Sequence, residues 1–315
     1  MDIHFLQSAN WQAFQEALGR KVFFREGEGW QYRAILEPGS RLAPPRLYCP
    51  YGPTATSQRA LATALESLKA LAKSLDVAFV RVQPLGNEEG TFSHEKLGLK
   101  QIEYSQPSDT WCIDLTPDAD DIVAQMKQNN RSIYRNYQKK DLTYRTSVDT
   151  SEIDHLLTLL HETAERNHIT AHSDDYLRTQ AQTLLPLDAA TLHFMEYEGD
   201  VIAAALTYHT ATTTYYAHAS AAQKHKKLAA STALVAEIIM RAKQNGRTTC
   251  DLYGITTSDD PAHSWAGFTR FKKSFGGYHK HLSATYDLPM KTGLYHTYNA
   301  AKRSRALSQR LKNLI

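Results

Sequence analysis

A lysine pair that follows an aromatic residue and precedes two glycines is the part of the sequence best suited to chemistry. Residues 267–278 read GFTRFKKSFGGY, and their three phenylalanines recur at the spacing of one helical face. Gly276 and Gly277 predict the left-handed turn that ends a helix. Lys272 directly follows Phe271, so we expect its ammonium group at the edge of an apolar pocket. A fixed cation there could stabilise an oxyanion, although solvated lysines on a surface helix are the simpler interpretation of this pattern alone.

Two other segments concentrate positive charge and could bind phosphate. Residues 223–230 read QKHKKLAA and contain three lysines: Lys224, Lys226 and Lys227. A helix is predicted to begin with Thr116 as its N-cap and Pro117 at its first helical position. Its later part would carry one stripe of basic residues at intervals of four: Lys127, Arg131, Arg135 and Lys139. Solvated surface residues would give the same two patterns, so the fold must decide between these interpretations.

The composition sets the limits of what the chain can be. Its 315 residues are enough for two domains, each with its own core. A formal net charge of +3 argues against wholesale coating of nucleic acid but permits local basic patches. Three widely spaced cysteines and fourteen histidines without a ligand-like cluster predict neither disulfides nor a metal site. With no secretion signal in residues 1–10 and no run of about 20 apolar residues, we expect a cytoplasmic protein without a transmembrane segment.

The first hundred residues predict an α/β arrangement, in which a leucine-patterned helix leads into a buried strand. In order, the expected elements are a helix after Ser8, strands 22–24 and 30–36, helix 57–75, strand 77–82, short helix 93–96 and strand 100–104. Pro107 lies in the segment 105–109, which is the most plausible boundary.

The second part predicts helices around a three-stranded meander. After strand 110–115 and the helix from Thr116, the expected elements are helices 153–166 and 174–184, strands 191–197, 201–209 and 212–219, helix 232–243, strand 248–253, helix 268–275 and a basic tail helix from 288. The order helix, strand, loop and glycine-stopped short helix occurs in both halves. Aligning the halves places Arg81 on Asp251, which indicates an internal duplication.

This order of elements is that of the N-acetyltransferase-like (GNAT) fold. We therefore predict an α/β fold class with two tandem GNAT-like domains, each a mixed, mainly antiparallel sheet flanked by helices. Residues 1–107 with 288–315 are expected to form the first domain, and residues 108–287 the second. Acyl-CoA members of this fold need a glycine-rich turn at the position of 223–230, where backbone N–H groups approach the pyrophosphate. The absence of glycine there disfavours CoA and leaves a bulkier phosphodiester, such as an RNA end.

Short motifs occur in a fixed order along the whole chain. They are Phe5-Leu6-Gln7-Ser8 with Trp11, Arg131-Ser132-Ile133-Tyr134-Arg135 before Lys139-Lys140, Glu165-Arg166 with Ile169, Ala219-Ser220, Asp251-Leu252-Tyr253-Gly254, and Gly267-Phe268 with Phe271-Lys272 and Phe275-Gly276-Gly277. In order and spacing they resemble the Fem family of peptidoglycan-bridge aminoacyltransferases (FemX, FemA, FemB). The coiled-coil arm of some members is absent, which makes the chain more similar to FemX.

The resemblance implies a cofactor-free, tRNA-dependent transfer of an amino acid to an amine in the stem peptide of a peptidoglycan precursor. Lys272 matches the functional lysine of the family, with Phe271 shaping its pocket. Residues expected to contact the aminoacyl-tRNA are Lys224, Lys226, Lys227, Arg131, Arg135 and Lys273. Residues expected to contact the precursor are His172, Tyr176, Gln83, Arg81, Gln15, Tyr215 and Tyr216. Asp251, His172 and Asp109 are possible proton acceptors, and proton transfer assisted by the substrate is equally open.

Three positions depart from the pattern expected of FemX-like members. Gln15 stands where a lysine is expected, Gln83 where an aspartate precedes a proline, and His172 where an arginine is expected. The acceptor is therefore open: a UDP-linked precursor, a lipid-linked precursor that would bring the protein to the membrane surface, or an acceptor outside the cell wall. Two alternatives are an acyl-CoA-dependent N-acyltransferase and a non-catalytic protein that binds RNA or the precursor.

Overall fold

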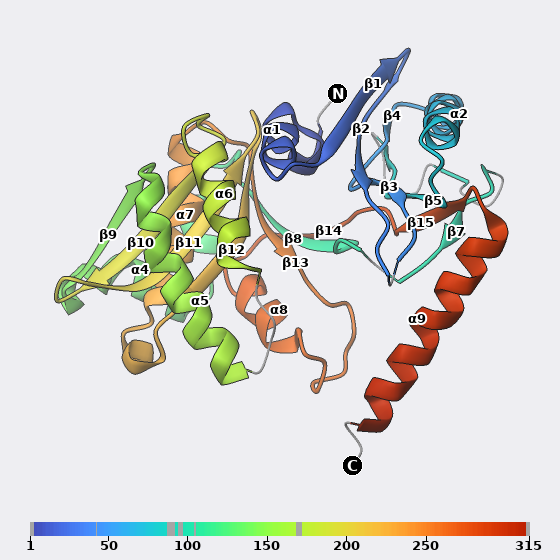
Figure 1. Ribbon diagram of the computed structural model, residues 1–315. Coiled ribbons are helices and arrows are strands. Elements are labelled where there is room, and N and C mark those ends of the chain that lie inside the picture. Colours follow the sequence, from blue (N-terminus) through green and yellow to red (C-terminus); the bar gives the residue numbers. More distant parts are fainter. Residues whose placement is uncertain are drawn as a thin grey trace. The chain divides into compact units, whose positions relative to one another are not determined.

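The chain forms two compact units in the computed structural model, which describes residues 3–41, 43–86, 92–93, 97–103, 105–167 and 172–312 (Figure 1). The first unit comprises residues 3–108 and 282–315, and the second comprises residues 109–281. The sequence placed the return to the first unit at residue 288. The strand Tyr286–Pro289 already pairs within the first sheet, so the chain returns earlier than predicted.

The first unit is a mixed sheet with helices on both faces. Its elements are η1 (Phe5–Gln7), α1 (Ala9–Ala17), β1 (Lys21–Gly27), β2 (Trp30–Glu37), β3 (Arg46–Cys49), β4 (Thr54–Ala55), α2 (Gln58–Ser74), β5 (Phe79–Val82), β6 (Leu85–Gly86), β7 (Lys100–Gln101), β15 (Tyr286–Pro289) and α9 (Thr292–Lys312). The strand order is β6-β4-β2-β3-β5-β15-β7, with β1 paired to β2.

Local sequence signals explain the two N-terminal helices of this unit. Ser8 caps α1 and Ser57 caps α2, each accepting a hydrogen bond from the backbone N–H three residues later at 3.1 Å. Successive residues of β5 point to opposite faces. Val80 packs with α2, whereas Phe79 packs against Tyr295 of α9. The two helices therefore cover opposite faces of this sheet.

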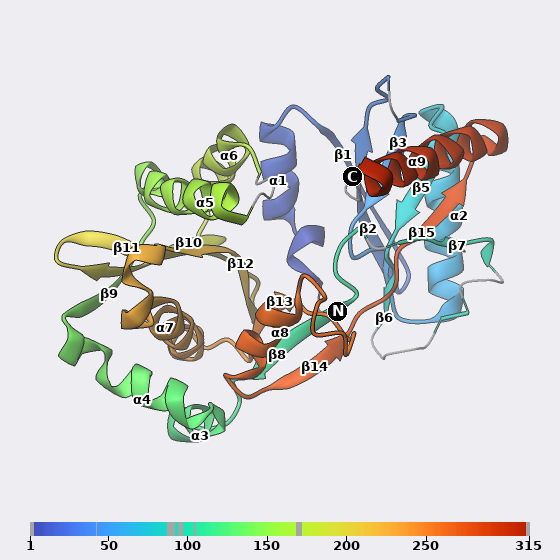
Figure 2. The ribbon, with the colours of Figure 1, turned by 90° about the horizontal axis from the view of Figure 1, so that it is seen from below.

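The second unit is also a mixed sheet between two layers of helices. Its elements are β8 (Asp109–Asp114), α3 (Ala119–Gln125), α4 (Gln128–Asn136), η3 (Tyr137–Lys140), β9 (Leu142–Ser147), η4 (Thr150–Glu152), α5 (Ile153–Asn167), α6 (Asp174–Leu184), β10 (Ala190–Tyr197), β11 (Asp200–His209), β12 (Thr213–Ala221), η5 (Gln223–Leu228), α7 (Ala230–Gln244), β13 (Thr249–Gly254), α8 (Ala266–Lys273) and β14 (Tyr278–His281). The strand order is β14-β8-β13-β12-β11-β10-β9. Figure 2 shows α5 and α6 on one face and α7 with α4 on the other.

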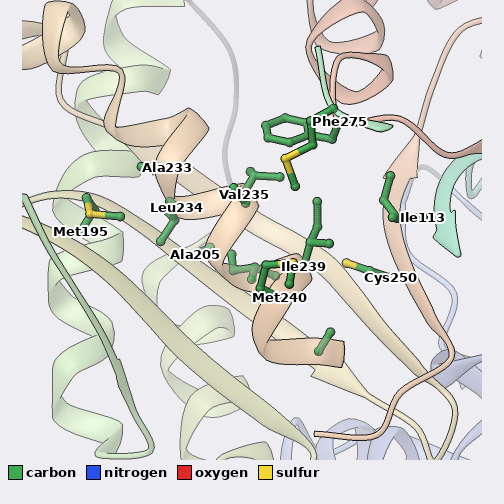
Figure 3. Packing of buried hydrophobic residues seen from close by; sticks show 14 of the residues in the cluster. Ile113, Met195, Ala205, Ala233, Leu234, Val235, Ile239, Met240, Cys250 and Phe275 are labelled. Carbon is green, nitrogen blue, oxygen red and sulfur yellow. The ribbon is translucent and has the colours of Figure 1, made fainter. Parts of the chain in front are cut away.

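The core of the second unit lies between α7 and the sheet. Val235 and Ile239 of α7 are fully buried together with Ile113 of β8 and Cys250 of β13. Phe275, just after α8, reaches the same cluster (Figure 3). The mixed sheets flanked by helices agree with the predicted fold class. Among the helices of the described residues, none is both long and apolar enough to cross a membrane.

Two local predictions for the second unit are wrong. The helix expected from Thr116 is two helices, because Met126 and Lys127 are extended between α3 and α4. Thr116 does not cap α3, since its N–H and hydroxyl both donate to Asp114, and the N-cap position is Asp118. The predicted basic stripe lies after this break: Lys127 is the N-cap of α4, Arg131 and Arg135 lie on α4, and Lys139 follows in η3.

Candidate active site

The double glycine after α8 is required by close packing on both sides. Gly276 and Gly277 have φ of 82° and 85°, which a residue with a Cβ rarely adopts. A Cβ on Gly277 would lie 2.2 Å from the carbonyl oxygen of Cys112, and one on Gly276 would lie 2.6 Å from Cβ of Gln125. The predicted left-handed turn is confirmed, and it leads the chain from α8 directly into β14.

The end of α8 is held by the start of α4. The backbone N–H of Lys127 donates to the carbonyl of Ser274 at 2.9 Å, and Nδ2 of Asn130 donates to Oγ of Ser274 at 2.7 Å. Phe271 packs edge-on against the buried Phe275, with ring centroids 5.2 Å apart. Phe268, expected on the same apolar face, is instead 60% exposed. Two of the three phenylalanines thus anchor the helix that carries Lys272.

Lys272 is partly buried, and its ammonium group has a fixed hydrogen-bond partner. Its Nζ donates to the carbonyl oxygen of Gly254 at 2.6 Å, which fixes the ammonium group at the end of β13. Burial lowers the pKa of Lys272 from 10.5 to about 8, while the negative charge of Asp251 opposes this shift. The ammonium is therefore less stable than that of a solvated lysine, and it is a stronger proton donor.

The segment after β13 is fixed to α8 at a second point. Thr269, one helical turn before Lys272, is buried and accepts a hydrogen bond from the N–H of Thr256 at 3.0 Å. Two hydrogen bonds thus attach α8 to the segment after β13: one joins Thr269 to the backbone of Thr256, and the other joins Lys272 to the backbone of Gly254. This gives the ammonium a defined position before any substrate binds.

Asp251 is a buried carboxylate at the turn where β13 ends. Its side chain is only 4% exposed, and burial raises its pKa, while hydrogen bonds and the charges of Lys280 and Lys272 oppose the shift. Its Oδ1 accepts the N–H of Tyr253 at 2.7 Å. Tyr253 has a φ of 68°, and the pairing of β13 with β8 is irregular between Asp251 and Gly254. The carboxylate therefore stabilises the backbone turn that presents the carbonyl of Gly254 to Lys272.

A row of polar aromatic residues continues from Asp251 across the sheet. Tyr215 lies opposite Asp251 in the β12–β13 pair, and Tyr208 lies opposite Tyr215 in the β11–β12 pair. The hydroxyl of Tyr208 and Nε2 of His218 are 2.9 Å apart. Rings of Tyr215 and Tyr253 are 6.5 Å apart between centroids, in an edge-on arrangement. These side chains form a largely buried polar row that continues from Asp251, and Tyr208 and Tyr215 are only 3% and 6% exposed.

The structure brings several of the residues expected to contact the precursor to this row. His172 stacks on Tyr176 with ring centroids 4.7 Å apart, and it lies edge-on to His218 at 5.5 Å. Tyr215 belongs to the row itself. The side chain of Tyr216 lies on the opposite face of the sheet and packs against the core under α7. Of the four such residues in this unit, three lie with the polar row and one with the core.

The sequence did not identify Tyr208 and His218 as site residues. Simple alternation along β12 would put His218 on the face opposite Tyr215, because the two residues are three positions apart. The register of β11 and β12 shifts between Leu206 and Thr207, so that His218 pairs with Leu206 and joins the face of Tyr215. A β-bulge of this kind cannot be recognised from the residue pattern alone.

The three residues of the first unit that were expected to contact the precursor are buried and have local partners. Arg81 forms a two-bond ion pair with Asp287 on β15, at 2.8 and 3.0 Å. Nε2 of Gln83 donates to the carbonyl of Ser283 at 2.9 Å. Gln15 accepts a hydrogen bond from Arg20 at 2.7 Å. Within this unit each side chain therefore supports the fold.

The residues expected to contact tRNA have different surroundings. Lys224, Lys226 and Lys227 are exposed on η5, immediately before α7. Arg135 and Lys273 are also exposed, and Lys273 lies over the ring of Trp111 at 5.3 Å. Arg131 is half-buried and donates to the carbonyl of Ala124 at 2.9 Å, near the end of α3. Its position after the helix break makes it a cap for α3.

The prediction that no histidines form a ligand-like cluster is wrong in one place. His279 and His281 of β14 lie with Asp109 of β8, and their ligand atoms are within 4.8 Å of one another. The sequence contains the signal as a His-x-His pair, but the pair becomes a cluster only when β14 is paired with β8.

Comparison with known proteins identifies a family match that includes α8 of the second unit. Residues 187–303 match the sequence model of the FemAB family, and this segment includes Lys272, Asp251 and the row from Tyr208 to His218. No curated protein sequence matches the chain.

Solved structures match over almost the whole chain. A crystal structure of FemX has 17% identity and a TM-score of 0.83, covering 93% of this chain and 94% of that chain. L-PGS from Bacillus licheniformis has 13% identity and a TM-score of 0.59, with 94% of each chain covered. A conserved protein of unknown function from Bacteroides thetaiotaomicron VPI-5482 has 12% identity and a TM-score of 0.57, covering 88% and 87%. The chain has the fold of FemX, and the resemblance to the Fem family is confirmed.

Proposed function

We propose that the protein is a Fem-type aminoacyltransferase, which passes an amino acid from aminoacyl-tRNA to an amine of a peptidoglycan precursor stem peptide. The observation that carries this proposal is the Lys272 ammonium, fixed on the Gly254 carbonyl with its pKa lowered to about 8 by burial. It lies within the segment that matches the FemAB family. A buried, positioned cation can stabilise the oxyanion that develops during acyl transfer.

The reaction follows from the position of this cation. The acceptor amine attacks the ester carbonyl carbon of aminoacyl-tRNA, and a tetrahedral oxyanion develops. The Lys272 ammonium would stabilise this charge, and its low pKa would also suit it to protonate the leaving ribose 3′-oxygen. The ester C–O bond breaks as the amide forms, and the proton lost by the amine restores the ammonium directly or through solvent. The ester supplies the driving force, so the reaction needs no cofactor.

Exposed basic residues near the start of α7 would bind the phosphates of the tRNA. Lys224, Lys226 and Lys227 lie on η5, and Ala229 then adopts a φ of 57° at the start of α7. Without a glycine-rich turn, these lysines provide point charges for a flexible phosphodiester chain. Lys273 and Arg135 would extend this basic surface, whereas Arg131 contributes mainly by capping α3.

The acceptor would be a peptidoglycan precursor, and the polar row would contact it. His172, Tyr176 and Tyr215 offer hydrogen-bonding and stacking groups beside the Lys272 site. Such a precursor is made in the cytoplasm, which is where we place the protein. Either a UDP-linked or a lipid-linked precursor fits, and the second would hold the protein at the membrane surface.

The proposal is tested by incubating the protein with a full set of charged tRNAs, each with a labelled amino acid, and with UDP-linked and lipid-linked precursors. We expect transfer of label to one precursor class, and loss of transfer after RNase pretreatment. Transfer that survives RNase would exclude the tRNA donor. Thermal stabilisation and turnover with acyl-CoA would favour the N-acyltransferase alternative, and binding without transfer from any charged tRNA would favour a non-catalytic protein.

A further inference from the structure

Asp109, His279 and His281 form a compact group of metal-ligating side chains at the edge of the second sheet. Oδ1 of Asp109 lies 2.8 Å from Nε2 of His279 and 2.8 Å from Nδ1 of His281. All three potential ligand atoms lie within 4.8 Å of one another. Two imidazoles and one carboxylate are a common ligand set for divalent transition metals.

The strand pairing holds these three side chains on one face. His281 lies directly opposite Asp109, and His279 lies opposite Trp111, in the antiparallel pair β14–β8. Residues two apart on a strand share a face, as do residues opposite each other. The intervening Lys280 therefore points to the other face. The backbone register therefore places the three groups side by side on one face, and their side-chain torsions set the distances between the ligand atoms.

This group is separate from the polar row and from Asp251. Asp251 pairs with Cys112 of β8. Cys112 lies three residues from Asp109, so Cys112 and Asp251 lie on the sheet face opposite to Asp109. The imidazoles are 41% and 56% exposed, and Asp109 is 17% exposed. A metal ion could therefore enter from solvent, with three protein ligands and at least one position open to water. The backbone of Asp109 is also linked to the lysine site, since its carbonyl accepts the N–H of Ile255, the residue after Gly254.

We propose that Asp109, His279 and His281 bind one divalent transition-metal ion of the Zn²⁺ type. In a tetrahedral site with bonds of about 2.0–2.1 Å, ligand atoms are about 3.3 Å apart. The carboxylate–imidazole distances are already close to that value, so a small rotation of exposed side chains opens the site. This proposal is independent of the transfer reaction, because it rests on β8 and β14 alone.

The test is metal binding by the chelator-treated full chain, measured by titration calorimetry with Zn²⁺ and by the visible absorption of Co²⁺. We expect one ion per chain and Co²⁺ bands typical of four or five ligands. His279→Gln, His281→Gln and Asp109→Asn should each weaken affinity by more than the roughly 10–100-fold that loss of an outer-shell partner costs. Zn²⁺ should raise the melting temperature of the wild type and have little effect on these variants.

A matched control is available in the same unit. Nε2 of His161 lies 2.7 Å from Oδ1 of Asp174 on the surface, and among the described residues this pair belongs to no group of three potential metal ligands. His161→Gln should leave Zn²⁺ affinity unchanged. Circular dichroism of the metal-free variants verifies that each is folded. No binding by the folded wild type, or equal binding by wild type and a His279→Gln/His281→Gln double variant, would overturn the proposal.

Discussion

Strand β5 of the first unit and strand β13 of the second occupy the same place in their sheets, but the buried charged residue on each strand has a different partner. Each follows a long helix and pairs in parallel with an earlier strand: Tyr48 lies opposite Arg81 in one, and Tyr215 lies opposite Asp251 in the other. The sequence alignment of the two halves had placed Arg81 on Asp251. Both units therefore bury a charged residue at an equivalent position beside a tyrosine.

The neighbouring strand on the other side determines whether that buried charge has a partner of opposite charge. In the first unit β15 supplies Asp287, which binds Arg81 through two hydrogen bonds and is fully buried. In the second unit β8 supplies Cys112 opposite Asp251, so no cation comes from the neighbouring strand. The first position is a closed ion pair that supports the fold. The second is a buried carboxylate whose charge acts on Lys272, and in the proposed mechanism the charge of that lysine is available to the substrate.

The largest effect should come from removing the ammonium of the second unit. Lys272→Met keeps an apolar stem of similar length but cannot stabilise an oxyanion. We expect the transfer rate to fall roughly 100- to 1,000-fold, the usual cost of one oxyanion donor. Lys243→Met, at the far end of α7, should retain full activity as a control. Turnover of the Lys272 variant at the wild-type rate would remove this lysine from the mechanism.

Stability should distinguish the two buried charges. Arg81→Met leaves Asp287 as a buried carboxylate without its cation and with the Tyr295 hydroxyl as a remaining donor, so we expect a loss of about 3–5 kcal/mol in the free energy of unfolding. Asp251→Asn removes a charge that burial disfavours and keeps an acceptor for the N–H of Tyr253. Because its folded pKa is raised, Asp251 costs stability above that pKa. The gain of the variant over the wild type should therefore grow as the pH rises from acid values.

Amide hydrogen exchange in the peptides of β5 and β13 measures the local effects of Arg81→Met and Asp251→Asn on stability separately. We expect faster exchange in β5 of Arg81→Met. In Asp251→Asn we expect exchange in β13 to be unchanged or slower. A similar loss of protection in both variants would contradict the distinction between the Arg81–Asp287 ion pair, which supports the fold, and the Asp251 carboxylate, whose charge is disfavoured by burial.

A smaller and salt-dependent effect is expected at η5. Replacing Lys224, Lys226 and Lys227 by glutamine should weaken binding of charged tRNA and flatten the dependence of log affinity on log salt by up to about 2 units. Filter binding at several salt concentrations measures this slope. Lys73→Gln on α2 should leave the slope unchanged. An unaltered slope in the triple variant would place the tRNA elsewhere.

The elements that position the site could largely be predicted from the sequence. The caps Ser8 and Ser57, the glycine stop after α8 and the exposed lysines before α7 depend on local signals, which one sequence contains. The break between α3 and α4 could not be predicted, because it is stabilised by distant hydrogen bonds from Lys127 and Asn130 to Ser274.

The composition of the site was harder to predict than its location. Lys272 was identified from its aromatic neighbours, but its low pKa follows from burial and from the position of Asp251. His218 joined the site only through a register shift in β12, and the His279–His281 pair became a cluster only through pairing with β8. Non-local pairing thus decided which polar residues meet.

The pH dependence of single-turnover transfer tests the role of Lys272 most directly. With spontaneous ester hydrolysis subtracted, the rate should fall as the pH rises through about 8, because the buried ammonium loses its proton there. Asp251→Asn should move this fall to lower pH, since the carboxylate raises the pKa of Lys272. The residual activity of Lys272→Met should show no such fall. A decline that persists in Lys272→Met, or a wild-type rate that stays constant well above pH 8, would contradict the proposed role of the lysine.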